Sequence, residues 1–334
     1  MNSFQRYEAM LAGRAVDFVP RVPILMQFAA EYIGSNYGAF ASDYRVLVEA
    51  NRRCAGDFGM DQVSAISDPY RETQGFGAEI EYVRDGVPRC LRHPLEENKD
   101  LDRLLHPNPR ECERMLDRIR AIETYREQLG GQVSILGWVE GPIAEAADLR
   151  GVTPFLMDLM EDEPFVEELM DRCVETGIAF ARAQIEAGAD TIGVGDALAS
   201  QVSPDVYERL VLPRERRLIE AIREAGAKVR LHICGNITHL LNGIRTLPIS
   251  ILDVDHMVDM AAARRAVGSG VALAGNIDPA SAVKTGTPKT IRETMRRIYE
   301  EVGNPFLVNA GCEIPSGTPY ENLRALCEPV AYRM

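Results

Sequence analysis

Short apolar stretches alternate along most of this chain with longer segments whose apolar residues recur at helical spacing. Apolar stretches of this kind predict buried strands, and the periodic segments predict amphipathic helices. Eight strands are expected, at 24–28, 60–66, 133–139, 190–194, 228–233, 249–254, 271–274 and 306–309. Helices are expected at 7–13, 43–58, 110–129, 153–159, 164–187, 204–225, 237–246, 260–267, 288–302 and 319–330.

This alternation predicts an α/β protein with a parallel sheet and helical crossovers. Eight strand–helix units favour a closed (β/α)8 TIM barrel. A doubly wound open sheet is the alternative. It is the weaker interpretation because Gly193-Val194-Gly195 lacks the third glycine of a dinucleotide-binding fingerprint.

Two segments depart from the repeat. Residues 1–20 form an expected N-terminal extension with a short helix. Residues 77–92 alternate around Arg84-Asp85-Gly86, where Asp-Gly predicts the turn of a β-hairpin insertion. We expect residues 1–334 to form one barrel domain that carries both additions.

Residues that could bind a ligand or take part in catalysis follow the ends of six predicted strands. In a β/α barrel these ends share one rim, where active sites are built. The residues are Trp138, Glu140, Asp196, His232, Cys234, Asp253, Asp255, His256, Asn276, Asp278, Cys312 and Glu313.

Three of these residues predict a metal site. His232 and Cys234 are two positions apart at a strand end, so both side chains point to one face. Such a pair alone is more often packing, but Cys312 follows another strand that ends on the same rim. One histidine and two cysteines favour zinc, and three protein ligands leave a position open, as in catalytic sites.

The charge of this predicted site favours one kind of chemistry. Zn²⁺ with two thiolates and a neutral imidazole is formally neutral, so a bound substrate thiol would lose its proton and stay electron-rich. The same site would activate water poorly. We therefore expect sulfur alkylation rather than hydrolysis.

Six further rim residues receive expected roles. Asp255 is expected to fill the open metal position or to orient His232. Asp196 and Glu140 are the other candidate catalytic carboxylates, and Asn236, Asn276 and Trp138 are the candidate cofactor- and substrate-binding residues. The alternatives are turn and helix caps for the polar residues and core packing for Trp138.

Composition excludes several classes of partner. The formal net charge is −13, with 37 Lys and Arg against 50 Asp and Glu and no basic block, so nucleic acid is not an expected partner. No apolar stretch reaches the roughly 18 residues that span a membrane. The start of the chain lacks the pattern of a signal peptide, so a cytoplasmic protein is expected.

Several segments carry a family resemblance. The segment from Gly193 to Asn236 has a Ser-Pro helix start and ends in LHICGN, and GPIAEAADLRG, GNIDPAS and NAGCEIPSGTPYENLRAL stand at 141–151, 275–281 and 309–326. Together they resemble the uroporphyrinogen decarboxylase superfamily from about residue 17 to the end. The decarboxylase itself has an N-terminal Arg-Gln-Ala-Gly-Arg signature, where this chain has Met26-Gln27-Phe28-Ala29-Ala30.

The His-x-Cys and later Gly-Cys patterns look like the zinc-dependent corrinoid methyltransferases typified by methylcobalamin:coenzyme M methyltransferase. The resemblance implies a β/α barrel, Zn²⁺ held by His232, Cys234 and Cys312, and a methyl group passed between a corrinoid cobalt and a zinc-bound thiol. The cobalamin-binding signature Asp-x-His-x-x-Gly is absent at all 5 histidines. A partner corrinoid protein is therefore expected to supply the corrinoid.

Three alternatives stay open at this point. A first-step demethylase would move a methyl group from a small donor to the corrinoid. A porphyrinogen decarboxylase would need no metal, and a non-enzymatic corrinoid-binding or chaperone module would hold a structural zinc. The sequence leaves open the methyl donor and acceptor, the direction of transfer, the fourth zinc ligand and the oligomeric state.

Overall fold

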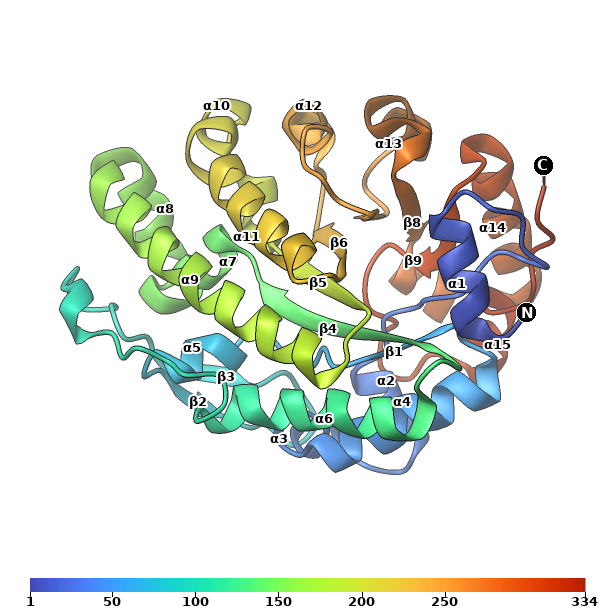
Figure 1. Ribbon diagram of the computed structural model, residues 1–334, viewed down its shortest axis with the longest axis horizontal. Coiled ribbons are helices and arrows are strands. Elements are labelled where there is room, and N and C mark those ends of the chain that lie inside the picture. Colours follow the sequence, from blue (N-terminus) through green and yellow to red (C-terminus); the bar gives the residue numbers. More distant parts are fainter. Residues whose placement is uncertain (334) are drawn as a thin grey trace.

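The computed structural model describes residues 1–333 and has a curled parallel sheet at its centre, with helices around the outside (Figure 1). Seven strands pair in the order β1-β4-β5-β6-β7-β8-β9. They are β1 (Gln62–Ser64), β4 (Ser134–Glu140), β5 (Thr191–Gly195), β6 (Lys228–Ile233), β7 (Ile251–Val254), β8 (Ala272–Ile277) and β9 (Phe306–Ala310). The predicted α/β barrel is confirmed.

Residues 20–22 fill the eighth position between β9 and β1. The Val22 N–H donates to the Val308 carbonyl at 2.8 Å, and on the other side the Asp61 N–H donates to the Arg21 carbonyl at 2.8 Å. The predicted first strand at 24–28 is therefore wrong in position. Pro20 and Pro23 have no N–H to donate, so few ladder hydrogen bonds form, and a helix already begins at Gln27.

Fifteen α-helices are present in residues 1–333. Those before β5 are α1 (Ser3–Leu11), α2 (Gln27–Tyr32), α3 (Tyr37–Ser42), α4 (Tyr44–Phe58), α5 (Arg71–Gly75), α6 (Glu113–Leu129), α7 (Pro142–Arg150), α8 (Val152–Glu161) and α9 (Glu163–Ala187). Those after β5 are α10 (Pro204–Val206), α11 (Leu212–Glu224), α12 (Leu241–Ile244), α13 (Met260–Val267), α14 (Pro288–Val302) and α15 (Tyr320–Leu326).

Local chemistry explains where several helices begin and end. Thr287 caps α14 and Pro288 takes its first position. Ser203 caps α10, and a π-helical turn at Tyr207–Val211 then leads into α11. Pro213 accounts for this turn, because it cannot donate the hydrogen bond that would continue an α-helix.

The two additions to the barrel lie at its two ends. Helix α1 covers the end where strands begin, since the Tyr7 hydroxyl lies 2.8 Å from the Thr191 hydroxyl and Glu8 pairs with Lys228. The strands β2 (Glu79–Glu81) and β3 (Arg89–Arg92) form an antiparallel hairpin. Its turn brings Val87 to the cavity described below. No helix within residues 1–333 is long and apolar enough to cross a membrane.

Candidate active site

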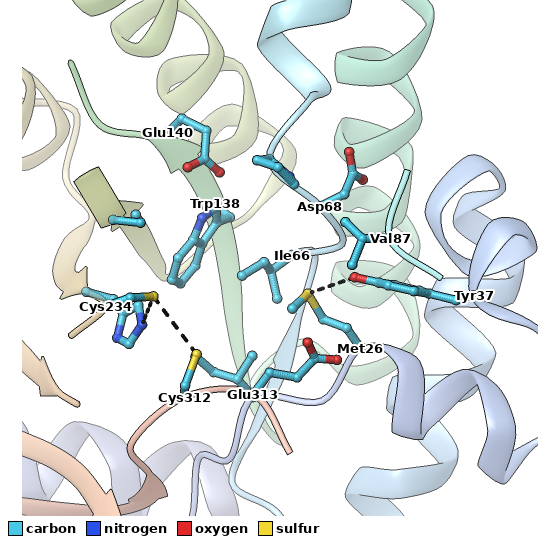
Figure 2. A pocket seen from close by; sticks show the side chains of 15 residues that line it. Met26, Tyr37, Ile66, Asp68, Val87, Trp138, Glu140, Cys234, Cys312 and Glu313 are labelled. Carbon is cyan, nitrogen blue, oxygen red and sulfur yellow. Dashed lines mark hydrogen bonds between the residues drawn. The ribbon is translucent and has the colours of Figure 1, made fainter. Parts of the chain in front are cut away.

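The predicted metal ligands lie together at the end of the barrel where the strands finish. His232 is in β6 and Cys234 follows it, whereas Cys312 follows β9. The His232 Nε2 atom lies 3.1 Å from the Cys234 Sγ, which lies 4.0 Å from the Cys312 Sγ (Figure 2). Barrel closure therefore unites residues separated by 78 positions.

These distances are compatible with one tetrahedral zinc ion. Sulfurs bound to zinc at ~2.3 Å would lie about 3.8 Å apart, and a bound nitrogen about 3.6 Å from each sulfur. The three ligand atoms lie within 4.8 Å of one another, and no fourth His, Cys, Asp or Glu in residues 1–333 joins the group. Such a group is compatible with a three-ligand site that keeps one position open.

Asp253, not Asp255, lies against His232, one of the predicted metal ligands. The Asp253 carboxylate is 3.3 Å from His232 Nδ1 and is itself held by Arg230 at 2.8 Å and Asn309 at 2.8 Å. Asp255 instead accepts the Gly235 N–H at 2.9 Å. The expectation that Asp255 orients His232 is therefore corrected, and Asp255 does not belong to the ligand group.

Electrostatics favour a positive charge between the three ligands. The hydrogen bond from the Cys234 thiol lowers the pKa of Cys312 to about 4, although burial opposes this. Burial alone would lower the pKa of His232, but the neighbouring sulfurs and Asp253 raise it well above its ordinary value. A divalent cation would take the place of the protons that these groups now share.

A cavity of about 180 Å³ opens beside this group. Its walls are mostly apolar and include the single tryptophan of the chain, Trp138. One face of the indole lies over the backbone of Gly193 and Gly195 in β5, where any Cβ would meet the ring. The lining residues are Ile24, Met26, Tyr37, Ile66, Asp68, Pro69, Val87, Trp138, Glu140, Gly195, Ala197, His232, Cys234, Cys312 and Glu313.

Three carboxyl groups face this cavity. Burial raises the pKa of Glu140 to about 8, and the Arg71 guanidinium that contacts it offsets this only in part. Burial also raises the pKa of Glu313 to about 7. Asp68 behaves differently: burial opposes its ionisation, but Arg114 and Arg71 keep its pKa below the ordinary value.

Sequence reasoning missed Asp68 and Tyr37. Asp68 lies shortly after β1, so the strand-end rule that found Glu140 would also have found it. Tyr37 comes from α3, and its hydroxyl donates to the Ser67 carbonyl. No sequence signal links that helix to the rim.

Besides Asp255, three further predicted site residues lie outside the cavity lining. Asp196 is fully buried and accepts the Ala144 N–H at 2.8 Å near the start of α7. Asn276 donates to the backbone carbonyls of Asp255 and Val258. Asn236 is exposed and accepts the Thr238 N–H. These hydrogen bonds to the backbone give all three side chains local structural roles.

Comparison with known proteins assigns nearly the whole chain to one family. Residues 2–332 match the family described as uroporphyrinogen decarboxylase (URO-D). The chain belongs to this family. It is 31% identical to the methylcobamide:CoM methyltransferase MtbA of Methanosarcina acetivorans, over 97% of this chain and 96% of that protein. It is 30% identical to the MtbA protein of Methanosarcina mazei, with the same coverage of both chains.

A solved structure agrees with this placement in the URO-D family. It is described as a methyltransferase from Methanosarcina mazei and superimposes with a TM-score of 0.90 at 25% identity, over 98% of this chain and 97% of that one. The predicted family and its methyltransferase branch are confirmed by these likenesses, as is the expectation of an enzyme.

Proposed function

We propose that this URO-D family member is a zinc-dependent methyltransferase that moves a methyl group between a corrinoid, supplied by a partner protein, and a small substrate at the zinc site. The observation that carries the proposal is the meeting of His232, Cys234 and Cys312 beside the cavity. The likeness to methylcobamide:CoM methyltransferases supports the corrinoid. A cytoplasmic location stays a prediction.

Each part of the site has a task in this proposal. His232, Cys234 and Cys312 would hold the ion, and Asp253 would fix the ring of His232 through Nδ1. When bound, zinc would lower the pKa of a substrate thiol. Trp138 and Ile66 line the cavity with apolar surface, which keeps water away from the reacting end of the substrate.

The cavity argues against the decarboxylase alternative. Uroporphyrinogen is a tetrapyrrole with many carboxylates, so its binding needs basic side chains. No lysine or arginine is among its lining residues in the described chain. Such a surface offers a polyanion none of the positive charge that it needs.

Replacement of Cys312 by alanine tests the proposal. The wild-type protein should hold about one zinc per chain and catalyse transfer with free methylcobalamin and a thiol. Cys312→Ala should lose zinc and at least ~100-fold in transfer rate, because two ligands hold the ion poorly. Cys112→Ala, which removes a partly buried thiol outside the site, is the control. Full transfer by a zinc-free Cys312→Ala protein would reject the proposal.

Two further assays separate the remaining alternatives. Methylcobalamin with a panel of thiols reports the thiol-methylating direction, and cob(I)alamin with methoxy, methylamine and methylthio compounds reports the demethylase direction. X-ray absorption at the zinc edge, with and without thiol, addresses the non-enzymatic alternative. A zinc coordination sphere that no thiol changes would favour a structural ion.

A further inference from the structure

Cys312 is held differently from the other two proposed metal ligands. His232 lies in β6, and Cys234 follows that strand directly. Cys312 lies beyond the end of β9, in residues 311–319, which form neither helix nor strand before α15 begins at Tyr320. We call residues 311–319 the Cys312 loop. Strand pairing alone does not fix this loop, so the position of the Cys312 sulfur depends on what the loop packs against.

The first half of the Cys312 loop lies along the segment that leads into α2. The Ile314 N–H donates to the Ile24 carbonyl at 3.0 Å. The Gln27 N–H donates to Glu313 Oε1 at 2.9 Å. Both contacts tie the loop to the part of the chain that follows the closure of the barrel, and both use backbone groups of residues 24–27.

One side chain of α2 holds the second half of the Cys312 loop. Glu31 Oε1 accepts the Ser316 hydroxyl at 2.7 Å, and Glu31 Oε2 accepts the Gly317 N–H at 2.9 Å. Gly317 has a φ of 68°, a left-handed conformation that favours glycine. A carboxylate suits this position because both of its partners donate. Glu31 therefore uses both oxygens to hold neighbouring residues of the loop.

Aromatic packing fixes α2 beside the end of the loop. The ring of Tyr320, at the start of α15, lies edge-on to Phe28 and Tyr32 of α2, with ring centroids 5.8 Å and 5.0 Å away. Edge-to-face pairs at such distances are favourable beyond the area that they bury. Glu31 precedes Tyr32 directly, so a helix held by these rings presents its carboxylate to the loop.

We propose that Glu31 is a positioning residue for Cys312, because its carboxylate fixes the Cys312 loop and so keeps the Cys312 sulfur at metal-binding distance from Cys234. This rests on the proposed zinc-dependent function. The two sulfurs lie 4.0 Å apart, close to the separation of about 3.8 Å for sulfurs bound to one zinc ion. A loop without Glu31 would have more freedom, and metal binding would then have to order it, which lowers affinity.

The zinc affinity of two Glu31 variants, measured by competition with a chelator, tests the inference. Glu31→Ala removes both acceptor oxygens and should weaken zinc binding about tenfold. Glu31→Gln keeps one oxygen for the Gly317 N–H, and its amide can donate to the Ser316 hydroxyl, so its affinity should lie within about threefold of the wild type. Glu328→Ala is the matched control and should leave zinc affinity unchanged, because Glu328 is also half-buried but pairs with Arg292 of α14.

A spectroscopic measurement separates the positioning of Cys312 from a general loss of stability. Co²⁺ bound in place of zinc absorbs light through its thiolate ligands, and this absorption should fall in Glu31→Ala but not in Glu328→Ala. Urea unfolding of the metal-free proteins reports their stability. Ser316→Ala removes only one donor to Glu31 and should weaken zinc binding about threefold. It takes the place of Glu31→Ala if that variant does not fold.

The outcomes separate this inference from the methyl-transfer proposal. If the wild type binds zinc but transfers no methyl group, while Glu31→Ala weakens zinc binding and lowers the Co²⁺ absorption, methyl transfer is rejected and the positioning role stands. Wild-type zinc affinity and Co²⁺ absorption in Glu31→Ala, or in Ser316→Ala where it takes that place, would overturn the positioning role while methyl transfer stands.

Two other results would also count against the role of Glu31. Equal losses of zinc affinity in Glu31→Ala and Glu328→Ala would overturn it, because the effect would then not act through the Cys312 loop. A wild-type protein that binds neither zinc nor Co²⁺ would overturn both the positioning role and the zinc-dependent function.

Discussion

Asp253 occupies a fully buried position between the Arg230 guanidinium and His232, a proposed metal ligand. Burial would raise its pKa, but Arg230 and then His232 hold that pKa well below the ordinary range, so the carboxylate stays ionised. An ionised carboxylate 3.3 Å from His232 Nδ1 fixes the ring so that Nε2 points at the two sulfurs. Orientation of this kind strengthens metal binding without direct contact to the metal.

We predict that Asp253→Asn weakens zinc binding by roughly 10–100-fold. The amide keeps the size of the side chain but loses the charge that orients His232. Zinc affinity would be measured by competition with a chelator, and urea unfolding of the metal-free protein would report any loss of stability from the unpaired Arg230. Asp255→Asn provides the comparison, and an equal loss there would contradict the assignment of His232 to Asp253.

The contrast between these two aspartates also shows how far residue-level prediction from sequence can go. The i, i+2 rule placed His232 and Cys234 on one face, and the rim argument added Cys312. The partner of His232 depends on the register between β6 and β7, which pairs His232 with Asp253 directly. Register follows from the packing of whole strands. The residues at the end of one strand are therefore not enough to predict which residue of the next strand lies beside them.

At the scale of the element, strand β5 has glycine where the Trp138 indole packs against it. A Cβ at Gly193 would stand 2.1 Å from the Trp138 ring, so the indole requires a strand without side chains at this point. We predict that Gly193→Ala costs about 1–3 kcal/mol of unfolding free energy and shifts the emission of Trp138. Gly56 in α4 has no atom within 4 Å of an added Cβ, so Gly56→Ala should be neutral or stabilising. Equal losses in both variants would contradict this packing argument.

The bounds of helices were predicted well where the spacing of apolar residues determines them. The prediction failed for elements whose position depends on tertiary contacts. The helices α13 and α14 have the predicted bounds, because each has a clear amphipathic pattern and a capping residue. Helix α7 was not predicted, since it is buried on nearly every side and lacks a polar face. The first strand was predicted at 24–28, but residues 20–22 take the eighth position of the barrel. Pro20 and Pro23 leave this segment few hydrogen bonds to its neighbours.

At the scale of the whole molecule, the site depends on closure of the barrel by residues 20–22. This segment joins β9, which leads to Cys312, with β1, which leads to Asp68. At the end where strands begin, Asp61 secures the closure: its carboxylate accepts the Arg21 N–H at 2.8 Å and contacts the Arg21 and Arg6 guanidiniums. Asp61 is completely buried, so these charges have little water to compensate them.

We predict that Asp61→Asn lowers the free energy of unfolding by about 3–5 kcal/mol. The loss should fall at the lower end of this range, because Asp17 still pairs with Arg6. Glu49→Gln, which removes an exposed partner of Arg52, should cost less than ~1 kcal/mol and serves as the control. Urea unfolding measures both variants. Asp61 lies at the opposite end of the barrel from the metal ligands, so folded Asp61→Asn protein should still bind zinc. A loss as small as that of Glu49→Gln would show that backbone hydrogen bonds alone close the barrel.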